Sequence, residues 1–126
     1  MIVGIGIDII EIERVNAALQ REAFVRRVFT VGEREYCESR GVQRSASYAA
    51  RFAAKEAAVK ALGTGFSGGS WQDVSVVLDA QGQPHLQLQG YYDQVACSKG
   101  VTRMYLSLTH AREYAAAQVV MWGDGA

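Results

Sequence analysis

The feature that most constrains the fold is an alanine-rich segment, residues 51–65, which runs into a glycine-rich turn. Alanine, leucine, lysine and glutamate all favour the α-helix, and Gly63 lies where a left-handed C-terminal cap is expected. Large apolar residues at helical spacing form one stripe, which consists of Tyr48, Phe52, Val59 and Leu62. We therefore predict a central helix whose apolar stripe packs against the core.

Three charged residues on this helix need an explanation. Glu56 lies at the edge of the apolar stripe, and Lys60 follows one turn later. The two could form an ordinary i,i+4 salt bridge, worth about 0.2–0.5 kcal/mol. Together with free backbone N–H groups in the glycine turn, they could instead hold a metal ion and a phosphate, provided that a second carboxylate comes from elsewhere. Lys55 falls inside the apolar stripe, where its ammonium group needs a partner.

The opening segment, residues 2–9, is predicted to be a strand with two unlike faces. One face is apolar and consists of Ile5, Ile7 and Ile9. The other carries Asp8 behind two glycines, Gly4 and Gly6. Because the two glycines carry no side chains, we expect open space over this face. Glycine within a strand also often marks the close approach of a ligand or another backbone. Asp8 is either a functional carboxylate or a structural residue, namely a polar strand end or the cap of the following helix.

A concentrated basic surface is predicted between residues 14 and 27. The pattern of residues 11–21 favours a short helix with Arg14 and Arg21 on its outer side, and the next segment adds Arg26 and Arg27. These arginines either face solvent beside glutamate partners or form a docking surface for an acidic partner. The net charge of the whole chain is zero, so bulk electrostatics does not indicate binding to nucleic acid or to an anionic membrane.

The rest of the pattern separates helices from strands. Residues 30–33 fit a capping box that opens another helix, and Ser45 or Ser47 is a candidate cap for the central helix. Alternating residues then predict a hairpin over 74–88, a short helix over 91–99 and two strands over 104–110 and 115–122. Helices in the first half and antiparallel strands in the second predict an α+β fold, formed by residues 1–126 as one domain.

Several classes of protein are disfavoured by what the chain does not contain. No apolar run reaches the roughly 18–20 residues of a membrane span, and no signal-peptide pattern opens the chain, so we expect a cytoplasmic protein with no membrane partner. Cys37 and Cys97 have no CxxC spacing, which indicates free thiols. His110 ends a predicted strand without the neighbours of a nucleophilic triad, so on residues alone it is more often structural than catalytic.

Three separate segments, taken together and in order, resemble the holo-acyl-carrier-protein synthases of the 4′-phosphopantetheinyl transferase superfamily. They are residues 4–9, 51–65 and 107–110. The resemblance implies that superfamily's fold, with N-terminal helices packed on an antiparallel sheet. It also implies transfer of 4′-phosphopantetheine from coenzyme A to a serine of apo acyl carrier protein, which leaves adenosine 3′,5′-bisphosphate and supports fatty acid biosynthesis. The family forms homotrimers with active sites at the subunit clefts, and the length of this chain favours that small type.

The resemblance further implies roles for individual residues. Asp8 and Glu56 match magnesium ligands, and with Lys60 they form the catalytic group. The positions that match the coenzyme A site are Arg51 and His110 at the nucleotide end, Lys60 at the diphosphate, and Gly63 and Thr64 at the phosphate-side turn. The positions that match the carrier-protein docking surface are Arg14 and Arg21.

The implied chemistry is physically consistent with these residue types. Two carboxylates without a nearby histidine suit Mg²⁺, which is usually held by one or two carboxylates, substrate phosphates and water. Either Glu56 or a metal-bound water takes the proton of the attacking serine. The alternative function is a non-catalytic module that binds carrier proteins, and the joint presence of Asp8, Glu56 and Lys60 argues against it.

Overall fold

The computed structural model describes residues 1–124. Along the chain the elements are β1 (Ile2–Glu11), α1 (Ile12–Ala18), α2 (Glu22–Val28), α3 (Val31–Glu38), η1 (Gly41–Gln43), α4 (Arg44–Leu62), η2 (Trp71–Asp73), β2 (Val74–Leu78), β3 (Pro84–Leu88), α5 (Gly90–Ser98), β4 (Val101–His110) and β5 (Tyr114–Gly123). Three strands form an antiparallel sheet in the order β1-β5-β4, and β2 and β3 form a separate hairpin. The predicted α+β class is therefore confirmed.

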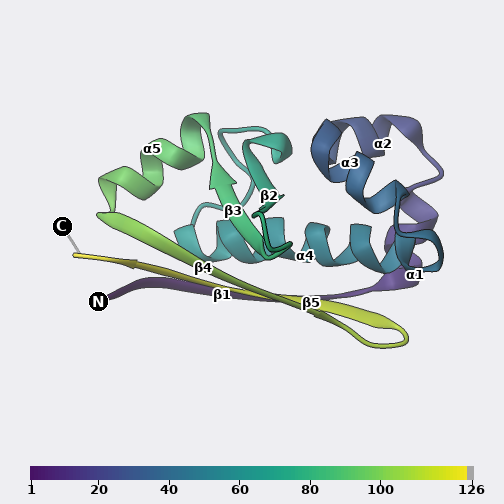
Figure 1. The fold of residues 1–126 in the computed structure, drawn as a ribbon. Helices are drawn as coiled ribbons and strands as arrows, with labels where there is room; N and C mark the ends of the chain where they lie inside the picture. Colours follow the sequence, from purple (N-terminus) through teal and green to yellow (C-terminus); the bar gives the residue numbers. More distant parts are fainter. Residues whose placement is uncertain (125–126) are drawn as a thin grey trace.

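Helix α4 is the element against which the other layers pack. It lies along one face of the three-stranded sheet, with the hairpin and α5 over its C-terminal half and α1, α2 and α3 around its N-terminal half (Figure 1). Each half contributes to its own cluster of buried apolar residues. The buried positions of α4 are mostly alanines, whose small side chains let the neighbouring elements come close to the helix axis.

The glycines of β1 let the backbone of α4 approach the strand directly. A Cβ atom at Gly4 would collide with the carbonyl oxygen of Ala61, and one at Gly6 would collide with that of Ala57. The prediction of open space over this face is therefore wrong, because the close approach that the glycines permit is that of another backbone. Asp8, the next residue on the same face, consequently lies beside α4.

A buried ion pair joins α4 to α3 and to the hairpin. Lys55 Nζ lies 2.8 Å from Glu33 Oε1, and neither side chain is exposed. Lys55 also donates to the carbonyl of Val74 at 2.6 Å, and the second oxygen of Glu33 accepts from the N–H of Val76 at 2.8 Å. Burial lowers the pKa of Lys55, while the charge of Glu33 acts in the opposite direction. The expected partner of Lys55 exists, and removing either member would leave a buried charge uncompensated.

The segment after β1 differs from the predicted helix over residues 11–21. Strand β1 continues as far as Glu11, which is paired with Tyr114 of β5, and α1 ends at Ala18. Arg21 therefore lies outside α1, at the N-cap of α2. The pairing with β5 takes precedence over local helix propensity because it continues an existing ladder of hydrogen bonds.

The two helix starts differ in how well the sequence predicted them. The capping box of α3 is confirmed, since Thr30 and Glu33 exchange both hydrogen bonds. The serine cap of α4 is wrong, because α4 begins at Arg44 directly after η1 and its N-cap, Gln43, makes no side-chain bond. Ser45 instead donates to Asn16 of α1 at 2.7 Å.

We predict that Gly6→Ala lowers the free energy of unfolding by about 3 kcal/mol, because the added methyl group has only the backbone of α4 to displace. Gly32→Ala is the matched control, since a Cβ there meets no atom within 4 Å, and it should change stability by less than about 1 kcal/mol. Urea titrations followed by circular dichroism measure both. Equal stabilities for the two variants would contradict the packing of β1 on α4.

Candidate active site

Asp8 and Lys60 meet where β1 passes the C-terminal half of α4. Lys60 Nζ lies 2.9 Å from Asp8 Oδ1 and also donates to the carbonyl of Ile7 at 3.2 Å. The i,i+4 salt bridge between Glu56 and Lys60 is absent from the ion pairs of residues 1–124, because the ammonium group turns to the strand instead. Asp8 is also not a helix cap, since the N-cap of α1 is Glu11.

Glu56 belongs to the same group of charges. Its carboxyl is half-buried beside β1, and its pKa is raised first by burial and second by the negative charge of Asp8, while Lys60 lowers it. An effect of Asp8 on the pKa of Glu56 requires the two carboxylates to be near each other. The second carboxylate that the central helix lacked therefore comes from the opening strand.

The donor set at this place suits a divalent cation that prefers oxygen. Two carboxylates that repel each other would be stabilised by a cation between them, and Mg²⁺ commonly takes one or two carboxylates with its other ligands from water and phosphate. Within residues 1–124 no group of three or more histidine, cysteine or acidic side chains is placed to hold a metal. This arrangement fits Mg²⁺ shared with a phosphate ligand better than an all-protein metal site.

The turn after α4 is built to end the helix and not to donate to a ligand. Gly63 has φ +78°, so the predicted left-handed cap is confirmed. The N–H groups of Gly63, Thr64 and Gly65 donate to the carbonyl of Val59 at 3.0, 3.1 and 3.4 Å. The prediction of free N–H groups is therefore wrong for Gly63, Thr64 and Gly65, because the exposed carbonyls of the last helical turn use them.

Arg51 is a buried cation with few partners. Arg51 is 5% exposed. Its guanidinium lies 4.3 Å from the ring centroid of Tyr36 and donates to the carbonyl of Ser47 at 3.4 Å. Within residues 1–124 no carboxylate lies within ion-pair distance of it. Arg51 lines a cavity of about 230 Å³ between α3, α4 and β2. A buried guanidinium with unused donors is a candidate ligand for an anion.

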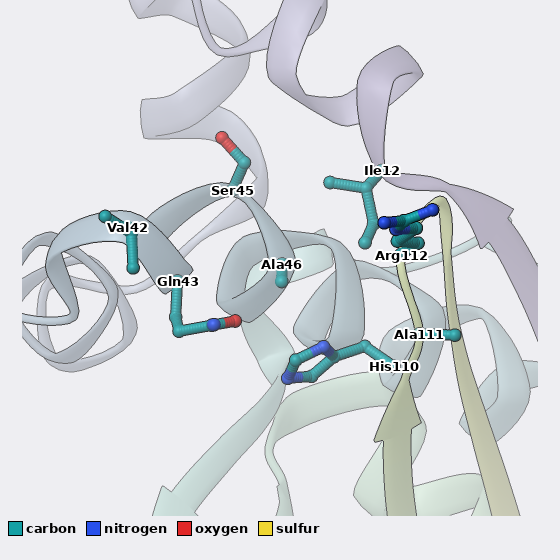
Figure 2. Close-up of a pocket in the computed structure, with 8 residues that line it drawn as sticks. All are labelled: Ile12, Val42, Gln43, Ser45, Ala46, His110, Ala111 and Arg112. Atoms are coloured by element: carbon teal, nitrogen blue, oxygen red, sulfur yellow. The ribbon is translucent and has the colours of Figure 1, made fainter.

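His110 lies in a different hollow, at the other end of α4. Figure 2 shows its ring directed towards Gln43 and Ala46 at the start of α4, with Arg112 of the β4–β5 turn on the same wall. The hollow has a volume of about 440 Å³. His110 belongs to β4, and Asp8 belongs to β1 at the opposite edge of the sheet. The hollow that His110 lines is not lined by Asp8.

The basic surface around α1 and α2 is only partly neutralised. Arg26 pairs with Glu22 at 2.7 Å. Arg14 and Arg21 are exposed, and within the described part of the chain neither has a carboxylate at ion-pair distance. The guanidinium of Arg21 lies over the ring of Phe24, 5.8 Å from its centroid. Arg27 is likewise exposed and without such a pair among the described residues, so the charge available to a partner lies at Arg14, Arg21 and Arg27.

For two residues near these sites, the sequence did not predict the contact that they make. Glu33 is the partner of Lys55, whereas the sequence pattern predicted only its role in the capping box. Tyr36 supports Arg51 from α3, and no sequence pattern links the two helices. Pairings of this kind join segments that are distant along the chain, so periodicity within one segment does not reveal them.

Comparison with known proteins gives consistent matches over nearly the whole chain. Residues 4–119 match the family model of the 4′-phosphopantetheinyl transferase superfamily. The holo-[acyl-carrier-protein] synthase of Alkaliphilus metalliredigens is 46% identical over 122 residues, which cover 95% of this chain and 98% of the relative. That of Koribacter versatilis is 44% identical over 126 residues, covering 96% and 98%.

Solved structures agree with this. The holo-[acyl-carrier-protein] synthase of Neisseria meningitidis superposes with a TM-score of 0.87 at 32% identity, covering 97% of this chain and 99% of that one. The Bacillus anthracis enzyme in complex with coenzyme A (3′,5′-ADP) has a TM-score of 0.78 at 39% identity, covering 96% of both chains.

The coupling of the three charges predicts opposite effects of two substitutions on the pKa of Glu56. Asp8→Asn removes a nearby negative charge and should lower it, whereas Lys60→Met removes a positive charge and should raise it. Titration of the carboxyl ¹³C signal of Glu56, with a chelator present, measures both. Shifts in the same direction, or none, would show that these groups are not neighbours.

Proposed function

The chain belongs to the 4′-phosphopantetheinyl transferase superfamily, and we propose that it transfers 4′-phosphopantetheine from coenzyme A to a serine of apo acyl carrier protein. The curated relatives carry the corresponding name at 44–46% identity. The observation that carries the proposal is the ion pair between Asp8 and Lys60, beside Glu56. These are the three residues that the reaction needs.

The proposed reaction breaks the phosphoanhydride bond of coenzyme A and forms a phosphodiester bond to serine. The serine oxygen attacks the phosphorus that bears pantetheine, the bond to the second phosphate breaks, and adenosine 3′,5′-bisphosphate leaves. Asp8 and Glu56 would hold Mg²⁺, which neutralises charge on the phosphate oxygens. Lys60 adds a positive charge for the diphosphate. Glu56, or a water held by the metal, would take the serine proton.

We propose a homotrimer as the active assembly, supported by the uncovered face of the sheet. On the side away from α4, Ile5, Ile7 and Ile9 are 56–66% exposed, and Tyr105 and Trp122 lie on the neighbouring strands. A contiguous apolar face of this kind indicates an interface. Association would also let Arg51 and His110 of one copy meet Asp8, Glu56 and Lys60 of another. Light scattering that gives the mass of one chain would contradict the proposal.

The remaining partners follow from the same proposal. An acidic carrier protein would dock on Arg14 and Arg21, whose charges are not neutralised by neighbours among residues 1–124.

No helix among residues 1–124 has the length and apolar character needed to cross a bilayer. We place the protein in the cytoplasm, in the service of fatty acid biosynthesis. Normal levels of holo carrier protein in cells depleted of this chain would contradict that role.

Incubation of apo carrier protein with this protein, coenzyme A and Mg²⁺ should add one phosphopantetheine to the carrier, detected by intact-mass spectrometry. Asp8→Asn and Glu56→Gln should each reduce the rate at least 100-fold, as expected for loss of electrostatic stabilisation of a transition state. Glu35→Gln, which removes an exposed carboxylate on α3, is the control.

A chelator should stop transfer and Mn²⁺ should restore it. Coenzyme A binding without transfer by the unaltered protein would favour the alternative, a non-catalytic carrier-binding module.

Reversal of the basic surface should affect one substrate only. Arg14→Glu combined with Arg21→Glu should raise the KM for carrier protein at least tenfold, make it less sensitive to salt, and leave the KM for coenzyme A unchanged, because charge pairs across an interface mainly govern association. Initial rates at two ionic strengths measure this. An unchanged KM for carrier protein would remove the docking assignment.

A further inference from the structure

The first three backbone N–H groups after α4 are not available to a phosphate. The N–H groups of the Gly63–Gly65 turn are already bonded to Val59. A helix C-terminus also carries a partial negative charge, which repels anions. Besides the Mg²⁺ that Asp8 and Glu56 would hold, only Lys60 has so far been assigned to the diphosphate, and it is shared with Asp8 and the carbonyl of Ile7. A further cation at this turn would therefore strengthen the binding of a diphosphate there.

Lys99 provides a cation at this place from a different element. It follows α5 as the C-cap residue, and its Nζ donates to the carbonyl of Leu62, the last residue of α4, at 2.7 Å. Gly63 has no side chain, and a Cβ placed there would lie 3.7 Å from Lys99 Nζ. The ammonium group thus lies directly against the turn that the coenzyme A phosphates are proposed to approach.

The charge of Lys99 is available to a ligand. Among residues 1–124 no carboxylate lies within ion-pair distance of its Nζ. An ammonium group has three N–H donors, and the bond to Leu62 uses one of them. Its contact with a helix-terminal carbonyl offsets the partial negative charge of that helix end and fixes the position of the remaining donors.

We propose that Lys99 is a further binding residue for the diphosphate of coenzyme A, acting beside Lys60. The proposal rests on the proposed function, since it assigns a contact within that same site. Lys60 approaches the diphosphate from α4 and Lys99 approaches it from the end of α5. Two lysines from different elements would supply the positive charge that the bonded N–H groups of Gly63, Thr64 and Gly65 do not offer.

A purely structural role, as a cap of α4, would make different demands on the side chain. Lys99→Gln keeps a neutral donor that can reach the carbonyl of Leu62 but removes the charge. Lys99→Arg keeps the charge, and Lys99→Met removes both. Binding of the diphosphate depends on the charge, whereas capping depends only on the donor, so the three variants separate the two roles.

The test is isothermal titration of the full-length protein with coenzyme A and Mg²⁺ at low and high salt. Lys99→Gln and Lys99→Met should each weaken binding about tenfold at low salt, the loss expected for one charge-assisted hydrogen bond. Lys99→Arg should bind within about twofold of the unaltered protein. The difference between Lys99→Gln and the unaltered protein should shrink at high salt. Arg26→Gln, which removes an exposed and already paired charge, is the matched control and should bind normally.

The possible results separate this proposal from the proposed function. Thermal unfolding curves show whether each variant is folded. If Lys99→Arg and Lys99→Gln are equally stable, a difference between their affinities for coenzyme A reports the effect of the charge alone. Unchanged affinity in Lys99→Gln, with lower stability only in Lys99→Met, would overturn the binding role and leave a cap. Failure of the unaltered protein to bind coenzyme A would instead overturn the proposed function.

Discussion

The contact of β1 with the backbone of α4 determines where the charged groups of this protein meet. Gly4 and Gly6 carry no side chains, so the carbonyls of Ala57 and Ala61 lie where Cβ atoms would otherwise be. This close approach brings Asp8 to the side of α4 that carries Lys60 and Glu56. With larger residues at these two positions the strand would move away from the helix, and the ion pair of 2.9 Å would be lost.

A second constraint sets the rotation of α4 about its axis. Lys55 is fixed inward by Glu33 and by the carbonyl of Val74. Neighbouring residues of a helix lie about 100° apart, so holding Lys55 against α3 and the hairpin directs Glu56 away from them, towards β1. One alanine-rich helix thus carries a buried charge that orients it and, beside that charge, the carboxylate proposed to act in catalysis. Small alanines flank the two residues on both sides along the helix.

The residues proposed to bind coenzyme A lie in separate places around α4. Arg51 and His110 lie in hollows around the first half of α4, while Lys60 and the Gly63 turn lie at its end. Neither hollow is lined by Asp8, Glu56 or Lys60. The apolar outer face of the sheet supports the proposal that copies of the chain associate and complete each other's sites.

The sequence by itself determined the features that depend on neighbours along the chain. These are the central helix and its Gly63 cap, the capping box at Thr30, the hairpin, the two-faced opening strand and the family. Only the tertiary structure decided what fills the glycine face, which carboxylate Lys60 meets, where the helix after β1 begins and ends, and that the N–H groups of the Gly63 turn are already used. In each case, atoms from different segments compete for the same place or the same hydrogen bond. Packing between segments that are distant along the chain decides the outcome, and the periodicity within one segment carries no information about that packing.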